Sequence, residues 1–141
     1  IAVRGQLTDE WKTRGVQEGK EYAILTAEIS RATFGLTPTE YMQHKGLQRE
    51  NLRDHMTNLE LIFTMLGEEQ TKQEAIGSDA QGFSENKDAA VKGGRAAGKA
   101  LNAFEGETGK KVVTSGNFKK QIADAKKQNA PKQVKSPDDK P

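Results

Sequence analysis

The sequence predicts an all-α fold, a small multi-helix domain around one central apolar helix with a basic, partly disordered C-terminal tail. Residues with high helix propensity are common, whereas β-branched and aromatic residues are sparse. Hydrophobic residues are 33% and charged residues 30% of the 141 residues, so the core is lean. The most apolar run has the spacing of one helix face, with offsets of four, three, four and three between Leu52, Met56, Leu59, Phe63 and Leu66.

The first two predicted helices come from shorter apolar patterns. Residues 1–15 are expected to be helical because Leu7 and Trp11 are four apart, and Trp11 is expected to anchor the core. Residues 20–34 repeat apolar positions at offsets of three and four, which again favours a helix. A short strand at 22–26 is the alternative, because short apolar runs fit both structures.

A short third helix is predicted by a clear start signal. Thr37 can cap it, Pro38 suits the first helical position, and Glu40 completes a capping box. This helix should run to about Lys45 and stop at Gly46, which gives a tight turn before the central helix.

The central helix is expected from about Gln48 to Leu66, with a kink or end at Gly67. Further apolar residues make it hydrophobic almost all round, so we expect it to be buried on several sides; they are Leu61, Ile62 and Met65. A second capping box at Thr71 predicts a short helix to about Ile76, followed by a loop at 77–82.

The next predicted helix is notable for its small residues. Ser84 should cap it, and it should run from Glu85 to about Glu105. One of its faces is expected to pack closely on the central helix; that face holds Ala90, Gly94, Ala97, Leu101 and Phe104.

The C-terminal part is predicted to contain a short extended piece at 110–114 and a last helix at 118–128, capped by Asn117. Residues 129–141 are mostly Pro, Lys, Asp and Gln and are expected to be disordered. The predicted division is therefore a helical domain at 1–128 and a tail at 129–141.

Charge is distributed unevenly along the chain, although the net charge is only +2. Residues 1–109 carry 13 Lys and Arg against 17 Asp and Glu, whereas residues 110–141 carry 9 against 3. A basic end can hold a polyanion, although a solvated tail has the same composition. The candidate nucleic-acid contacts are Lys110, Lys111, Lys119, Lys120, Lys126 and Lys127.

No catalytic site, metal site or cofactor is predicted. Residues 93–100 nearly match a phosphate-binding loop, but the hydroxyl that would hold magnesium is replaced by Ala100, and no strand precedes the segment. The only two histidines, His44 and His55, lack the fixed spacing of a metal motif. The chain has no cysteine, and no serine lies in a nucleophile elbow. We therefore expect a protein that is not an enzyme.

The turn at Gly46 and the first part of the central helix form the candidate interaction surface. Arg49 and Arg53 would share a helix face, with other polar and charged residues beside them. An ordinary salt-bridged helix surface is the alternative. The full candidate set is His44, Lys45, Arg49, Arg53, Asp54 and His55.

The same turn carries a family likeness. The pattern combines Lys45-Gly46-Leu47 with Asn51-Leu52-Arg53-Asp54-His55-Met56 and continues through Leu59-Glu60-Leu61, with further matches over about residues 4–118. In this pattern the chain resembles the C-terminal region of the bacterial DNA damage-inducible protein D (DinD) family, which includes prophage proteins.

The resemblance implies a regulatory module of the bacterial DNA-damage (SOS) response that modulates RecA-type recombinase filaments on DNA. It also implies an upstream domain of the BRO/antirepressor type before Ile1, and a cytoplasmic, nucleoid-associated location. Two alternatives stay open. One is a phage antirepressor-type regulator, which would bind a repressor or form a homo-oligomer. The other is a DNA-binding module. No apolar run approaches the length of a membrane span, so no membrane partner is expected.

Overall fold

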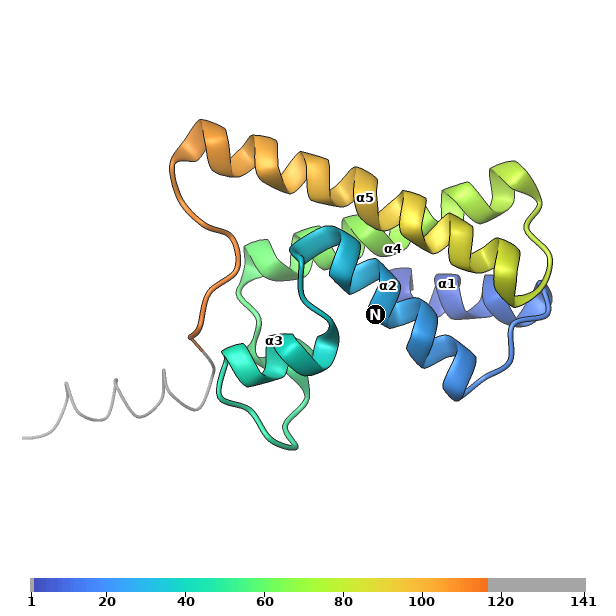
Figure 1. The fold of residues 1–141 in the computed structure, drawn as a ribbon, viewed down its shortest axis with the longest axis horizontal. Coiled ribbons are helices and arrows are strands. Elements are labelled where there is room, and N and C mark those ends of the chain that lie inside the picture. The colour runs from blue at the N-terminus through green and yellow to red at the C-terminus, as the bar shows by residue number, and fades with distance from the viewer. Residues whose placement is uncertain (1, 117–141) are drawn as a thin grey trace, which may run out of the picture.

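The computed structural model of the chain describes residues 2–116. The predicted helix at 118–128 and the predicted tail at 129–141 lie outside this range. The described residues form only helices, turns and irregular segments, which confirms the all-α prediction (Figure 1). The elements in order are α1 (Ala2–Thr13), α2 (Lys20–Phe34), α3 (Pro38–His44), the 3-10 helix η1 (Leu52–His55), α4 (Asn58–Ser78) and α5 (Gly82–Thr108).

Helix α5 packs on both α2 and α4, and α1 packs on α4. Helix α3 and the segment that follows it lie at one end of this bundle, next to the start of α4 (Figure 1). No helix in the described range is long and apolar enough to cross a bilayer.

Helices α2 and α3 follow the sequence closely. Helix α2 has the predicted bounds, so the strand alternative at 22–26 is wrong, and Gly35 ends it in the left-handed conformation at φ 78°. Thr37 and Glu40 form the predicted capping box at the start of α3. Gly46, at φ 72°, follows the end of α3 as predicted. These features were predictable because capping depends on adjacent residues.

The central helix is displaced from its predicted position. Residues 48–57 are mostly irregular, and α4 begins only at Asn58, where Thr57 and Glu60 form a capping box. The helix continues through Gly67 without ending there. Thr71 lies inside it and donates its hydroxyl to the Gly67 carbonyl at 2.7 Å, so the predicted second cap is wrong.

The buried face of α4 also differs from the predicted apolar face. The buried positions are spaced by three or four residues and are Glu60, Phe63, Gly67, Thr71 and Ala75, with Glu68 beside them. Three apolar residues expected in the core are instead partly exposed to solvent: Leu59 at 40%, Ile62 at 51% and Leu66 at 39%. Small and polar residues face the core because α5 approaches this side of α4 closely.

The small residues of α5 let it approach both α4 and α2 closely. The predicted packing on the central helix is found, but Gly94 of the predicted face lies against Ile29 and Ala32 of α2 instead. A Cβ added at Gly93 would lie 2.4 Å from the Thr71 backbone nitrogen, and one at Gly98 would lie 2.4 Å from the Ala32 carbonyl oxygen. Helix α5 is longer than predicted at both ends, and Ser84 lies inside it. Residues 93–100 are helical throughout, so the segment resembling a phosphate-binding loop is a packing surface.

Apolar side chains of the described residues gather in three clusters, of which the smallest contains only Ala75, Ala80 and Ala89. The largest one is centred on Trp11, which is fully buried as expected, and includes Leu7, Val16, Leu25, Ile29 and Ala90. The second contains Phe63, Leu101 and Val112. Val112 belongs to the segment 110–116, which is not a strand but is attached to the body at this point.

Candidate functional site

The segment 45–57 joins α3 to α4 and carries most of the predicted interaction residues. In the structure some of these side chains are exposed to solvent and others are buried. His44, Arg49 and Asp54 are exposed, and we call these three side chains the turn surface. Arg53 is half-buried. Lys45 and His55 are 1% and 9% exposed, so their prediction as surface residues is wrong.

Lys45 is buried because it anchors two parts of the chain. Its Nζ donates to Glu60 Oε1 at 2.9 Å and forms a fully buried ion pair with it. The same Nζ donates to the carbonyl oxygens of Thr114 at 3.0 Å and Gly116 at 2.7 Å. Lys45 therefore links the turn, the first turn of α4 and the end of the described chain.

Glu60 is the centre of this buried polar network. Oε1 accepts from the Thr57 backbone in addition to Lys45, and Oε2 accepts from the Tyr41 hydroxyl at 2.5 Å and the Thr114 backbone at 3.0 Å. Burial alone would raise the pKa of Glu60, but the hydrogen bonds together lower it. The carboxylate is thus held ionised with both oxygens bonded.

A second buried carboxylate, Glu68, lies two turns further along α4. Its Oε2 forms ion pairs with Arg53 of the turn and with Arg4 of α1, the latter at 3.6 Å. Arg4 also donates to Thr26 at 2.8 Å and lies over the Trp11 ring at 5.4 Å. Burial raises the pKa of Glu68, and the two arginines oppose that shift.

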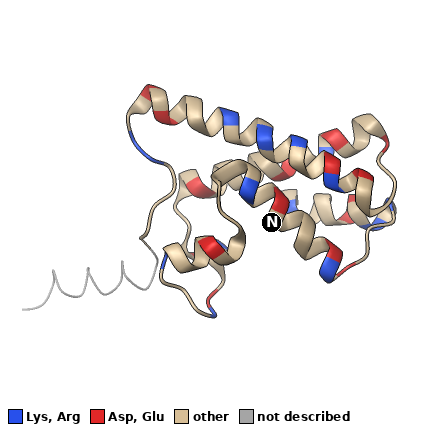
Figure 2. Cartoon of the chain, viewed as in Figure 1, with Lys and Arg blue, Asp and Glu red and all other residues tan. Residues whose placement is uncertain are grey.

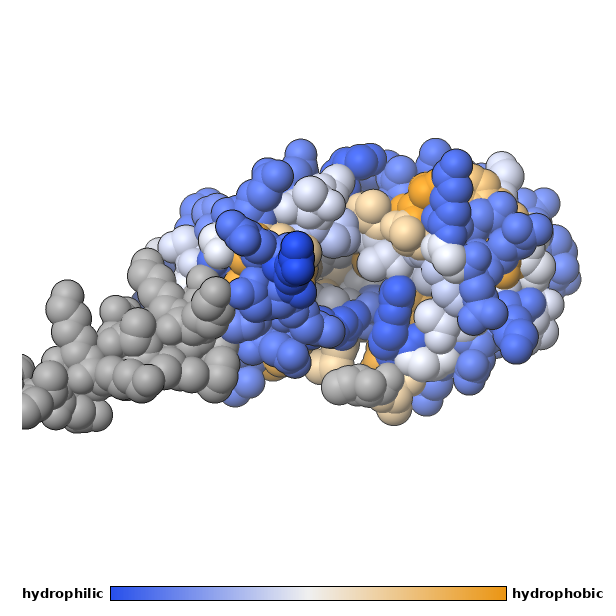
Figure 3. Space-filling view, turned by 90° about the horizontal axis from the view of Figure 1, so that it is seen from below, coloured by the Kyte–Doolittle hydropathy of each residue, from blue (hydrophilic) through white to orange (hydrophobic). Residues whose placement is uncertain are grey.

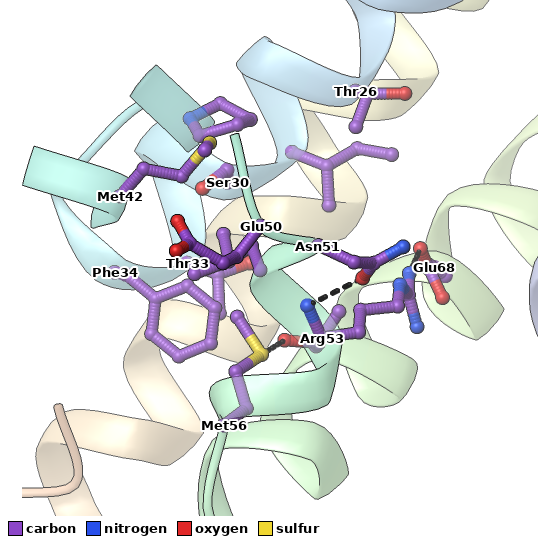
Figure 4. A pocket seen from close by; sticks show the side chains of 14 residues that line it. Thr26, Ser30, Thr33, Phe34, Met42, Glu50, Asn51, Arg53, Met56 and Glu68 are labelled. Carbon is purple, nitrogen blue, oxygen red and sulfur yellow. Dashed lines mark hydrogen bonds and ion pairs between the residues drawn. The ribbon is translucent and has the colours of Figure 1, made fainter. Parts of the chain in front are cut away.

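Unlike the Glu60 network, this cluster contains buried polar atoms that form no hydrogen bond. Glu68 Oε1 and Arg4 Nη1 are buried, and neither has a hydrogen bond. Glu68 lines a cavity of about 380 Å³ between α2, α3, the segment 45–57 and α4. Figure 4 shows Glu68, Arg53 and Asn51 together at one end of this cavity, with Phe34, Met42 and Met56 at the other.

Sequence reasoning missed Arg4, Tyr41, Glu60 and Glu68 as site residues. The Thr57–Glu60 spacing is a capping box, so the position of Glu60 at a helix start could have been found. No local pattern indicates that Arg4 and Glu68 meet, because they are far apart in the chain.

The predicted metal and nucleic-acid residues are placed as follows. In the described part of the chain no group of three or more His, Asp or Glu side chains could hold a metal ion. Lys110 and Lys111 are exposed, and Lys111 forms an ion pair with Glu105 at 3.6 Å. The other candidate contacts lie outside the described residues, namely Lys119, Lys120, Lys126 and Lys127.

The surface around these residues is mixed in charge and hydropathy. Figure 2 shows acidic and basic residues on most helices, with basic positions along the middle of α5. Figure 3 shows a mostly hydrophilic face with small apolar patches.

Comparisons of the chain with protein-family models, curated proteins and solved structures find no significant match.

Proposed function

We propose that this chain is a non-catalytic regulatory interaction module of the bacterial DNA-damage response, which acts on RecA-type recombinase filaments. The observation that carries the proposal is the arrangement of residues 45–57. This segment bears the clearest part of the family likeness, and a buried network fixes it while His44, Arg49 and Asp54 face solvent.

Fixed surface segments suit protein recognition for a thermodynamic reason. A loop that is already ordered loses less conformational entropy when a partner binds. Lys45 fixes the start of this segment by its contact with Glu60, and in the middle of the segment the Asn51 side chain accepts the Arg53 backbone N–H at 2.9 Å. The charged turn surface then supplies complementarity to the partner rather than structural support.

The test is a filament assay with charge-reversed variants of the full chain. The double variant Arg49→Glu, Asp54→Lys should alter recombinase filaments on single-stranded DNA only at a concentration at least about tenfold higher than the unchanged protein requires. The reason is that charged side chains at the edge of an interface steer association. The helical circular dichroism of the double variant should match the unchanged protein. Lys12→Glu, an exposed charge reversal on α1, is the matched control and should act like the unchanged protein. Equal activity of the double variant would remove the turn surface from the proposal.

Direct DNA binding is a second candidate, favoured by one observation. Lys92, Arg95 and Lys99 are all exposed at helical spacing on α5. If they bind phosphates, the triple Glu variant should lower DNA affinity and flatten its dependence on salt, because each phosphate contact releases a counterion. DNA affinity and a salt slope unchanged from those of the original chain would exclude this stripe.

A further inference from the structure

The cavity beside Glu68 has the size and walls of a ligand site. Its volume of about 380 Å³ falls within the range of small-molecule pockets, roughly 300–1,000 Å³. One end is mainly apolar, formed by Phe34, Met42 and Met56 together with Leu52 and Pro38. Glu50 also lies at this end (Figure 4), where its Oε1 accepts the backbone N–H groups of Gln48 and Arg49. The apolar walls favour an apolar group over bulk water.

The other end offers one unused hydrogen-bond acceptor. Glu68 is 2% exposed, and its Oε1 has no hydrogen-bond partner among the described residues. Leaving a buried acceptor unsatisfied costs about 1–3 kcal/mol, and more for a charged group. Water is the alternative occupant, although the apolar walls offer it few hydrogen bonds.

The charges at this end select the kind of donor. Arg4 and Arg53 both pair with Glu68, so two positive charges already face one negative charge. A cationic donor would meet two guanidinium groups, and a carboxylate has no proton to donate at neutral pH. A neutral O–H or N–H donor fits without either cost.

We propose that this cavity binds a compact apolar group that ends in a neutral hydrogen-bond donor, of the phenol or indole class. The donor bonds Glu68 Oε1, and the ring lies against Phe34, Met42 and Met56. Such a group is available from a free small molecule or from a Tyr or Trp side chain of a partner. This binding does not depend on the proposed action on recombinase.

The three methionines provide the experiment. Met42 and Met56 line the cavity, whereas Met65 does not, so Met65 is an internal reference. The full chain carrying ¹³C-methyl methionine is titrated with p-cresol and observed by NMR. Saturable shifts are expected for the Met42 and Met56 methyl groups, with Met65 unchanged.

Two matched probes test the chemistry of the donor. Toluene has the same ring without a donor and should bind roughly fivefold to a hundredfold more weakly than p-cresol, since Glu68 Oε1 stays unpaired. Benzylamine is cationic and should bind more weakly than p-cresol as well. Equal affinity for p-cresol and toluene would overturn the assignment of Glu68. The absence of saturable shifts with p-cresol would overturn the site and leave water as the occupant.

Two variants separate binding from folding. Glu68→Met removes the acceptor and should make p-cresol and toluene bind equally well. Leu52→Trp fills the cavity while retaining Glu68, and it should abolish the p-cresol shifts at Met42 and Met56. If Glu68→Met loses its helical circular dichroism, the test rests on Leu52→Trp. Met42 and Met56 shifts with p-cresol that persist in Leu52→Trp would contradict the proposal.

A capped amino acid distinguishes the two sources. N-acetyl-tyrosinamide carries the same phenol on a peptide-like backbone. If it shifts Met42 and Met56 with an affinity within about tenfold of p-cresol, the mouth of the cavity admits a polypeptide side chain. If only p-cresol binds, the occupant is a free small molecule. Both outcomes support the site and assign its source.

Discussion

Glu60 and Glu68 are buried carboxylates two helical turns apart on α4, and both pair with a cation from the turn before α4. Glu60 pairs with Lys45, and Glu68 pairs with Arg53. They differ in whether both carboxylate oxygens accept hydrogen bonds. Every oxygen of Glu60 is bonded, by two side chains and two backbone amides, whereas one oxygen of Glu68 has no partner.

The difference separates a structural role from a binding role. A buried polar network that is fully satisfied fixes the groups around it, whereas an incomplete one leaves a group that another molecule can satisfy. Glu60 holds α3, α4 and the segment 112–116 in one arrangement. Glu68 lines a cavity, and one of its carboxylate oxygens has no hydrogen bond.

The largest expected effect on stability is in the fully hydrogen-bonded network around Glu60. Lys45→Met should lower the free energy of unfolding by about 3–5 kcal/mol, because it leaves Glu60 buried without its cation. The measurement is urea unfolding followed by circular dichroism. The exposed control Lys12→Met should change stability by less than about 0.5 kcal/mol. A loss below about 1 kcal/mol in Lys45→Met would show that the Lys45–Glu60 pair does not fix the fold.

A smaller effect on stability is expected for the ion pairs around Glu68. Arg53→Ala should cost about 1 kcal/mol, because Arg53 is 30% exposed and Glu68 keeps its ion pair with Arg4. Arg31→Ala breaks a more exposed ion pair with Glu28 and serves as the comparison, with a loss within about 0.5 kcal/mol. If Arg53→Ala cost as much as Lys45→Met, the two carboxylates would be equally structural.

The smallest expected difference is in the dependence of stability on pH, and it has opposite signs at the two sites. The folded pKa of Glu60 is lowered, so its ionised form adds stability above about pH 4.5 that is lost as pH falls. The folded pKa of Glu68 is raised, so its contribution is full at low pH and is lost as pH rises.

Unfolding measured between about pH 6 and about pH 3.5 reveals these signs. The stability lost in Glu60→Gln should shrink as pH falls, because the unchanged protein then loses the same contribution. The stability lost in Glu68→Gln should grow over that interval. Parallel pH profiles for the two variants would mean that the two carboxylates do not differ in their environments.

The fold was largely predictable where structure depends on neighbouring residues. Thr37 with Glu40, and Gly35 after α2, act within a few positions, and both were found. The start of α4 was misplaced because the apolar spacing from Leu52 to Phe63 continues through η1, although a 3-10 helix and a loop interrupt it. The Thr57 capping box, a local signal, marks the true start.

The candidate site was less predictable because burial there depends on distant residues. Lys45 has the sequence context of a surface lysine, yet Glu60, Thr114 and Gly116 enclose it. Glu68 adjoins Glu69 as an apparently ordinary acidic pair, but Arg4 and Arg53 meet it only in the folded chain. The exposed residues Arg49 and Asp54 were placed correctly at the surface.

The small residues of α5 have a consequence for the response of the protein to temperature. Of the residues buried on this helix only Leu101 has a large apolar side chain, the others being Asn86, Ala89, Ala90, Gly93, Gly94, Ala97 and Gly98. Unfolding therefore exposes little apolar area along this contact, and apolar exposure is what raises the heat capacity. The heat-capacity change per residue should fall below the usual value of about 12–15 cal/mol/K, which flattens the stability curve and weakens cold denaturation.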